Sequence, residues 1–173
     1  MNISDIKSKY QENGYALVRN LVDIESIDRF IDSFKHKLLD NDNLALPRMD
    51  TQEYGNFEQK NGYLQHPIAD VHLMGIIESY LKETCDLALE IITSNSIQGC
   101  LKNIHSSDEF SLVMSMFFDQ NRGTPAHQDL YYLDSLPHGN LTAVWIALED
   151  IDKRAGRFYV IPKSQNHFFE LSL

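Results

Sequence analysis

Cysteine and long apolar runs are both scarce in this sequence. Its 173 residues contain only Cys85 and Cys100, and neither lies in a CxxC motif or near a histidine at metal-site spacing. A disulfide framework is therefore excluded, and two reduced thiols are expected. No apolar stretch approaches the roughly 20 residues of a membrane-spanning helix, and residues 1–7 contain no apolar signal core. These absences predict a cytoplasmic protein without a membrane partner.

Basic residues are outnumbered as well. The sequence has 15 Lys and Arg against 25 Asp and Glu, which gives a net charge of −10. A surface of this sign repels nucleic acid and anionic membranes, so we expect neither as a partner. The length suits one domain with its own core. A hydrophobic fraction of 43% with a charged fraction of 23% is typical of a globular protein.

The first half of the chain has helical patterns. Ser4 is a suitable cap for a helix ending at Asn13, and Gly14 supplies the left-handed residue that closes such a helix. Residues 15–18 are then predicted to form a short strand. A second helix is expected after Asp23, with an apolar stripe made of Ile24, Ile27, Phe30, Ile31, Phe34 and Leu38.

A polar stretch and a third helical pattern follow. Residues 40–65 are polar and show no clear period, so we expect a long functional or mobile loop there. Pro67 suits the first turn of a third helix, which the apolar spacing extends to about Thr93. The sequence therefore predicts a helical part over residues 1–95.

The sequence changes character after Ser96. Short segments rich in β-branched and aromatic residues alternate with turn residues. We expect strands at 97–104, 110–119, 126–133, 141–148 and 157–161. Strands at this spacing indicate a sandwich or a jelly roll. Helices followed by strands make an α+β fold, here a single domain over 1–173 whose strand part covers 96–173.

His127 and Asp129 form the motif most suggestive of chemistry. On an extended segment, residues two apart point to the same side, so an imidazole nitrogen and a carboxylate oxygen would meet at one point. Two histidines and one carboxylate, with open positions left over, form the facial ligand set of non-haem iron(II) oxygenases. An isolated His-x-Asp pair arises easily by chance, so a surface or structural role remains an alternative on the motif alone.

Longer pieces of the sequence carry a resemblance to a known family. The run His-Gln-Asp-Leu-Tyr-Tyr at 127–132 follows a strand pattern at 113–118. A tryptophan-containing segment ending in acidic residues comes next at 142–150, and a glycine followed by a strand and Pro-Lys-Ser occupies 155–164. Together with the opening 10–18, these pieces resemble the phytanoyl-CoA dioxygenase family in order and spacing over most of the chain.

This resemblance implies a fold and an activity. The fold would be a double-stranded β-helix (a cupin-like jelly roll) with the N-terminal helices packed outside. The activity would be that of an iron(II)- and 2-oxoglutarate-dependent dioxygenase, which uses O2 to hydroxylate a small organic or acyl substrate. His127 and Asp129 would be two of its metal ligands. Halogenating relatives carry a small residue in place of the carboxylate, so the presence of Asp129 favours hydroxylation.

Two departures from the family pattern accompany the resemblance. The family's Pro-Gly-Ser-His appears here as Pro-Lys-Ser-Gln at 162–165. The family's second iron-binding histidine and its 2-oxoglutarate-binding arginine lie on strands beyond the position of Leu173. The resemblance therefore predicts a domain truncated at its C-terminus, without its last strands. An unpaired strand edge of this kind would allow self-association with another chain.

Three other residues are candidates for the same site. The resemblance implies a contact of Gln128 with 2-oxoglutarate, although its side chain should face away from the metal on an extended segment. Trp145 resembles a co-substrate-pocket residue, but a tryptophan on an apolar strand also suits the core. His167 could replace the missing third ligand, although the family does not use that position for iron.

Two other functions remain as alternatives. The chain could be a pseudoenzyme or a metal- or ligand-binding module that keeps two ligands and turns nothing over. It could also be a cupin-like metal or sugar binder, because fold alone does not determine function. Cupins usually supply more histidines from the strand that carries the first ligand, and this strand contains only His127.

Overall fold

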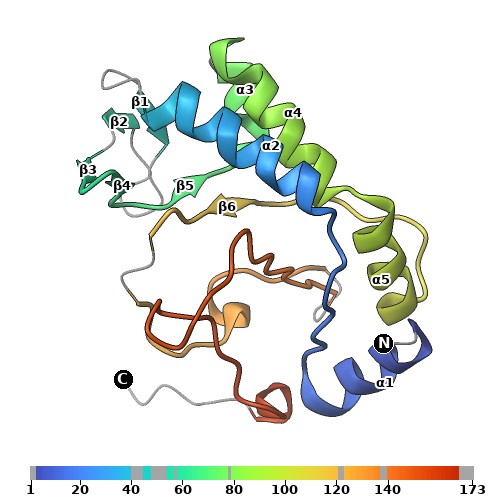
Figure 1. Cartoon of the computed structure of the whole chain (residues 1–173). Coiled ribbons are helices and arrows are strands. Elements are labelled where there is room, and N and C mark those ends of the chain that lie inside the picture. The colour runs from blue at the N-terminus through green and yellow to red at the C-terminus, as the bar shows by residue number, and fades with distance from the viewer. Residues whose placement is uncertain are drawn as a thin grey trace.

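The computed structural model describes residues 3–39, 45–47, 54–56, 58–77, 79–120, 123–136 and 140–167. Helices and three two-stranded antiparallel sheets make up its regular structure, so the chain is a mixture of helix and small sheets. Figure 1 shows helices α2 and α4 side by side across one side of the molecule. The part of the chain after strand β6 runs as a long irregular path on the other side.

Helix α1 (Ile3–Asn13) ends where the sequence predicts. Gly14 has a φ of 80°, and its N–H donates to the Tyr10 carbonyl at 2.8 Å, which closes the helix. The predicted cap at Ser4 is wrong, because the helix already begins at Ile3. The predicted strand at 15–18 is also wrong, since these residues pair with no other described segment and a strand needs a partner ladder.

Helix α2 (Ile24–Phe34) confirms the predicted cap. The Asp23 carboxylate accepts a hydrogen bond from the Ser26 N–H at 3.1 Å, and the helix continues into one turn of π-helix at Lys35–Leu39. The apolar stripe is buried at Phe30, Phe34 and Leu38, whereas Ile24 at its start is 73% exposed. The buried part of the stripe therefore begins nearer the middle of the helix than the sequence pattern predicts.

The segment predicted as a long loop contains short strands instead. Strands β1 (Ala45–Pro47) and β2 (Tyr54–Asn56) pair antiparallel, and so do β3 (Gln59–Lys60) and β4 (Tyr63–Leu64). The β3–β4 turn is Asn61-Gly62, and both residues have positive φ, 56° and 80°. Two such residues form the type I′ turn that suits a tight hairpin, and Asn-Gly is its characteristic sequence.

The predicted third helix from Pro67 to Thr93 is interrupted. It divides into β5 (Ile68–Ala69), a 3-10 turn (Val71–Leu73), α3 (Met74–Ile77), a second 3-10 turn (Ser79–Leu81) and α4 (Lys82–Ile92). Strand β5 pairs antiparallel with β6 (Met116–Phe117), and Asp70 after it adopts a left-handed φ of 48°. Pairing with a distant segment thus overrides the local helical pattern at the start of this stretch.

The strand predicted at 97–104 is helix α5 (Asn95–His105). Its apolar residues follow the helical spacing i, i+3, i+4 and i+7, at Ile97, Cys100, Leu101 and Ile104. The β-branched composition of the segment suggested a strand, but this period is that of an amphipathic helix. The helical part of the chain therefore extends about ten residues further than predicted.

The other predicted strands form little sheet. In the described residues after α5, β6 is the one strand with a ladder partner, and 3-10 turns occupy Asp129–Tyr131 and Ser164–Asn166. The segments 141–148 and 157–161 have no strand partner among the residues that the structure describes. No closed barrel forms among the described residues, so the predicted jelly roll is not seen here. Sheet formation needs neighbouring backbones about 4.8 Å apart along their length, and these segments lack that neighbour.

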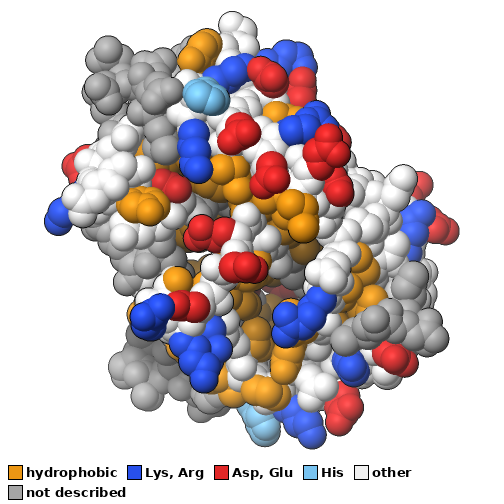
Figure 2. All heavy atoms as spheres, viewed as in Figure 1, with side chains coloured by type: hydrophobic (Ala, Val, Ile, Leu, Met, Phe, Trp, Pro, Cys, Tyr) orange, Lys and Arg blue, Asp and Glu red, His pale blue; other side chains and the backbone are white. Residues whose placement is uncertain are grey.

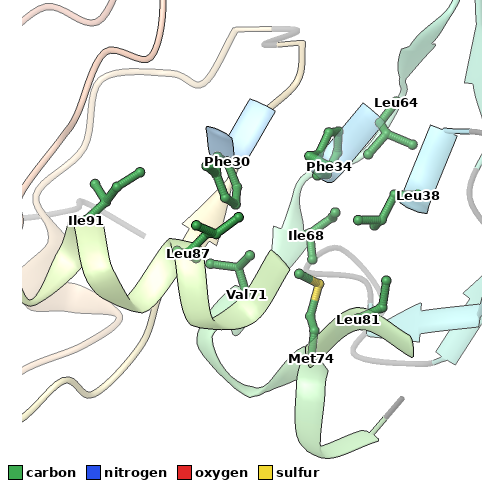
Figure 3. Close-up of a cluster of buried hydrophobic side chains, with 11 residues drawn as sticks. Phe30, Phe34, Leu38, Leu64, Ile68, Val71, Met74, Leu81, Leu87 and Ile91 are labelled. Atoms are coloured by element: carbon green, nitrogen blue, oxygen red, sulfur yellow. The ribbon is translucent and has the colours of Figure 1, made fainter. Parts of the chain in front are cut away.

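The hydrophobic core is built mainly by the helical half. Figure 3 shows its side chains converging from α2, β4, β5, α3 and α4. Its buried members are Phe30, Phe34, Leu38, Leu64, Ile68, Val71, Met74, Leu81, Leu87, Ala88 and Ile91. Phe117 of β6 packs against this cluster, with its ring centroid 5.4 Å from that of Phe30 and 4.3 Å from that of Phe34. Strand β6 therefore connects the core to the rest of the chain.

The outer face of α2 and α4 is polar and held by ion pairs. Arg29 pairs with Glu90 at 3.4 Å, Lys37 pairs with Glu83, and the side-chain hydroxyl groups of Ser33 and Thr84 are 2.7 Å apart below them. Figure 2 shows acidic and basic side chains interspersed over this face. A shallow hollow of about 760 Å³ runs between the two helices. None of the described helices is long and apolar enough to cross a membrane.

Candidate metal centre

His127 and Asp129 lie together, as their spacing predicts. Residues 123–128 are irregular and lead into the 3-10 turn Asp129–Tyr131. His127 Nε2 is 3.2 Å from Asp129 Oδ1, and the two side chains are 40% and 60% exposed. A nitrogen and a carboxylate oxygen therefore face one another at a point open to solvent.

The contacts of His127 decide which ring nitrogen could bind a metal. His127 Nδ1 is 2.8 Å from the Pro125 carbonyl oxygen, which can only accept a hydrogen bond. Nδ1 therefore carries a hydrogen, and in the neutral ring Nε2 keeps the free lone pair. Metal-binding histidines usually donate their other N–H to a carbonyl or carboxylate in this way, which fixes the tautomer and the ring orientation.

The separation of the two ligand atoms fits one metal ion. Ligand atoms each about 2.1 Å from a metal and about 90° apart lie about 3.0 Å from each other. The observed 3.2 Å between His127 Nε2 and Asp129 Oδ1 is close to that separation. One imidazole nitrogen and one carboxylate oxygen also suit a divalent first-row metal. The two residues thus fit as neighbouring ligands of such an ion.

The structure brings no third metal ligand to this pair within the part of the chain that it describes. There, no group of three or more His, Cys, Asp or Glu side chains is arranged to hold a metal ion. His167, the residue considered as a substitute ligand, contributes its backbone carbonyl to a hydrogen bond with Gln128. The ring of Tyr132 packs edge-on against His127, with centroids 5.7 Å apart.

Gln128 points to a different partner from its two neighbours. Its Nε2 donates to the Ser164 carbonyl at 2.8 Å and to the His167 carbonyl at 2.9 Å. Both amide hydrogens are thereby used, and Oε1 is buried without a hydrogen-bond partner. Since 2-oxoglutarate offers carboxylate and carbonyl acceptors, Gln128 has no donor to offer it in this arrangement.

Trp145 lies on the surface, so its interpretation as a core residue is wrong. The side chain is 48% exposed and its ring stacks on Phe158, with centroids 5.4 Å apart and planes 16° from parallel. In the described part of the chain, the segments around these two rings belong to no sheet. Trp145 and Phe158 form an exposed aromatic surface.

His105, to which sequence reasoning assigned no role, joins the two halves of the chain. Its Nε2 is 2.6 Å from the Thr142 Oγ1, which is also 3.2 Å from the Tyr10 hydroxyl. The Tyr10 and His105 rings meet edge-on at 6.2 Å. These contacts connect α1, α5 and the segment that carries Trp145. No sequence signal indicates them, because the three residues are far apart in the chain.

Comparison with known proteins defines the class. The chain matches the model of one protein family, described as phytanoyl-CoA dioxygenase (PhyH), over residues 10–171. The chain belongs to this phytanoyl-CoA dioxygenase family. Its members are oxygenase-type enzymes with a jelly-roll fold, and they generally depend on iron(II) and 2-oxoglutarate. Searches of curated proteins and of solved structures found no match.

Proposed function

We propose that this chain binds iron(II) through His127 and Asp129 and acts as a 2-oxoglutarate-dependent dioxygenase that hydroxylates a small organic or acyl substrate. Membership of the phytanoyl-CoA dioxygenase family supports the reaction class. The observation that carries the proposal is the 3.2 Å separation of His127 Nε2 and Asp129 Oδ1, with Nδ1 held by the Pro125 carbonyl.

The residues of the chain would bind and orient the reactants. His127 would donate the Nε2 lone pair, and the Asp129 carboxylate would neutralise part of the positive charge of the metal. Iron(II) with 2-oxoglutarate and O2 supplies the oxidising chemistry when bound, with succinate and CO2 as by-products. The protein contributes the ligand geometry and the shape of the surface around it.

Trp145 and Gln128 have different parts in this proposal. Trp145 resembles a co-substrate-pocket residue of the family, and its ring, stacked on that of Phe158, offers an apolar surface for a carbon chain. Gln128 could contact 2-oxoglutarate only by releasing one of its two backbone carbonyl partners, Ser164 or His167. A direct contact from Gln128 would therefore require rearrangement of the site.

An anaerobic titration tests the metal assignment. Adding iron(II) and 2-oxoglutarate to the purified chain should produce the weak visible charge-transfer band of the iron chelate. Asp129→Ala should abolish the band, or weaken metal binding by about 100-fold or more, because loss of a ligand exceeds the 10- to 100-fold cost of losing a supporting hydrogen bond. Asp150→Ala, a change of the same type at an exposed carboxylate, should leave the band intact.

Absence of the band with the wild-type chain, or its persistence in Asp129→Ala, would contradict the proposed ligands. A band with no effect of either substitution would place the metal elsewhere. Mn(II) binding is a second measurement of the same site, because Mn(II) is not oxidised during the titration.

A non-catalytic binding module is the second candidate function. The exposure of His127 and Asp129, 40% and 60%, favours it, because oxidative catalysis requires a site that excludes water. Succinate formation from iron(II), 2-oxoglutarate and O2 distinguishes the two functions. Metal binding without succinate would support the module, and steady succinate formation that depends on Asp129 would support the enzyme.

A further inference from the structure

The turn at residues 163–167 is held against the end of helix α1. Lys163, at a left-handed φ of 65°, begins it, and its N–H donates to the Asn13 carbonyl at 2.8 Å. Gln165 approaches so closely that a Cβ built on Gly14 would lie 2.3 Å from its Oε1. The turn therefore packs directly on the first helix, about 150 residues away along the chain.

The same turn is held from its other side by Gln128. The amide nitrogen of Gln128 donates to the carbonyls of Ser164 and His167, at 2.8 Å and 2.9 Å. The orientation of the amide follows from these contacts, because the opposite one would place Oε1 against two carbonyl oxygens. One side chain thus joins the metal-ligand segment to a turn that is itself fixed to α1.

The backbone directs the Gln128 side chain away from the side chains of its two neighbours. Its φ of −109° and ψ of 128° are extended, so its side chain leaves the backbone on the side away from those of His127 and Asp129. Each ligand is thereby one residue from a doubly hydrogen-bonded anchor. Fixing Gln128 limits how far the two ligand side chains can separate or rotate.

We propose that Gln128 is a positioning residue for the metal-ligand pair, through its double hydrogen bond to the 163–167 turn. This inference rests on the proposed function, because it assumes that His127 and Asp129 bind a metal. Gln128 orients the two ligand residues and does not touch the reacting molecules. Loss of the anchor should leave the ligands in place along the chain but less well oriented for a shared ion.

Gln128→Met tests the inference, since methionine has a similar length but no donor and adds no charge. Mn(II) alone is titrated into each variant, with free Mn(II) measured by electron paramagnetic resonance. Gln128→Met should weaken Mn(II) binding by about 10-fold or more, the usual effect of losing a supporting hydrogen bond. Amide hydrogen exchange should also quicken in residues 163–167, most of whose N–H groups donate to backbone carbonyls, while α2 and α4 keep their protection.

Gln98→Met is the matched control. Gln98 also donates its Nε2 to a backbone carbonyl, that of Thr93 at 2.7 Å, but it lies on α5 away from the candidate centre. Gln98→Met should change neither Mn(II) affinity nor exchange in residues 163–167. If Gln128→Met does not fold, Gln128→Asn serves in its place, because its side chain is one methylene too short to reach both carbonyls.

The two measurements separate this inference from the proposed function. If the wild-type chain binds Mn(II) and Gln128→Met binds it equally well, the positioning role is overturned and the ligand assignment stands. If the wild-type chain binds no Mn(II), the proposed function fails and the positioning role with it. Exchange in residues 163–167 then reports whether the anchor itself exists: faster exchange in Gln128→Met supports the anchor, and unchanged exchange rejects it.

Discussion

Asp119 shows how a single side chain responds to its place in the fold. It follows β6, is half-buried, and accepts a hydrogen bond from the Leu64 N–H at 2.8 Å. Burial raises the pKa of its carboxyl, and the negative charge of Glu149 adds to the effect, while the Leu64 hydrogen bond and Lys35 oppose it. Ionisation of Asp119 therefore costs more free energy in the folded chain than in the unfolded one.

The sign of the pH dependence follows from that shift. Because the folded-state pKa of Asp119 is raised, its protonated form stabilises the fold. This contribution is complete below the unfolded pKa of Asp, about 3.9, and is lost as the pH rises through the folded-state pKa. Asp119→Asn keeps an acceptor for Leu64 but removes the charge. We expect the variant to be more stable than wild type at pH 7, with the difference disappearing toward pH 4, in urea unfolding followed across that range.

Asp152 provides a control of opposite sign. Hydrogen bonds from Arg154 lower the pKa of its carboxyl, so Asp152→Asn should lose a small amount of stability at pH 7 and none in acid. An Asp119→Asn variant that is less stable than wild type at pH 7 would show that the charged carboxylate is favoured in the fold. The pH dependence attributed to its burial would then be wrong.

At the scale of elements, α2 depends on Asp23, the residue that caps its start. Asp23 accepts from the Ser26 N–H at 3.1 Å and satisfies one of the otherwise unpaired N–H groups at the helix start. Asp23→Ala should destabilise the chain by about 1 kcal/mol, the usual cost of removing such a cap. Urea unfolding should show a lower midpoint with an unchanged slope.

Asp28→Ala on the same helix is the matched control for this prediction. Asp28 is exposed in the middle of α2, so its replacement should change stability by less than about 0.5 kcal/mol. Equal effects of Asp23→Ala and Asp28→Ala would indicate a general effect of helix charge. The capping hydrogen bond would then have no separate contribution.

Element by element, prediction succeeded where the signal was local. The end of α1 at Gly14 and the start of α2 at Asp23 depend on residues within one turn, and both were predicted. The interruption of the third helix at 68–69 was missed, because it depends on pairing with Met116 and Phe117. The helix over 97–104 differs from the predicted strand, because the β-branched composition of the segment favours a strand while its apolar spacing is that of a helix.

For the whole molecule, the hydrophobic side chains are distributed unequally. Every fully buried hydrophobic residue described lies between Ile6 and Ile97. In the described residues after α5, large apolar side chains are at best partly buried, and those of Val144, Trp145, Phe158 and Ile161 are among the exposed ones. Stability therefore resides mainly in the helical half with β5 and β6, while the metal-ligand segment lies in the less buried half.

Two substitutions of one type measure this difference. Ile68 is 0% exposed and Ile161 is 52% exposed. Ile68→Val should cost about 0.5–1.5 kcal/mol because it removes a buried methylene, whereas Ile161→Val should change stability by less than about 0.5 kcal/mol. Urea unfolding of both variants is the measurement. Equal costs would show that the segment around Ile161 is as well packed in solution as the core.

The sequence by itself determined the end of α1 at Gly14, the Asp23 cap of α2, most of the apolar stripe of α2, the family and the closeness of His127 to Asp129. Each of these depends on residues close together in the chain, or on motifs read in order. Only the tertiary structure decided the β5–β6 pair, the exposure of Trp145 and the anchoring of Gln128 to the 163–167 turn. Those features join segments that are distant in the sequence. Contacts of this kind depend on how the whole chain packs, and a local sequence pattern does not contain that information.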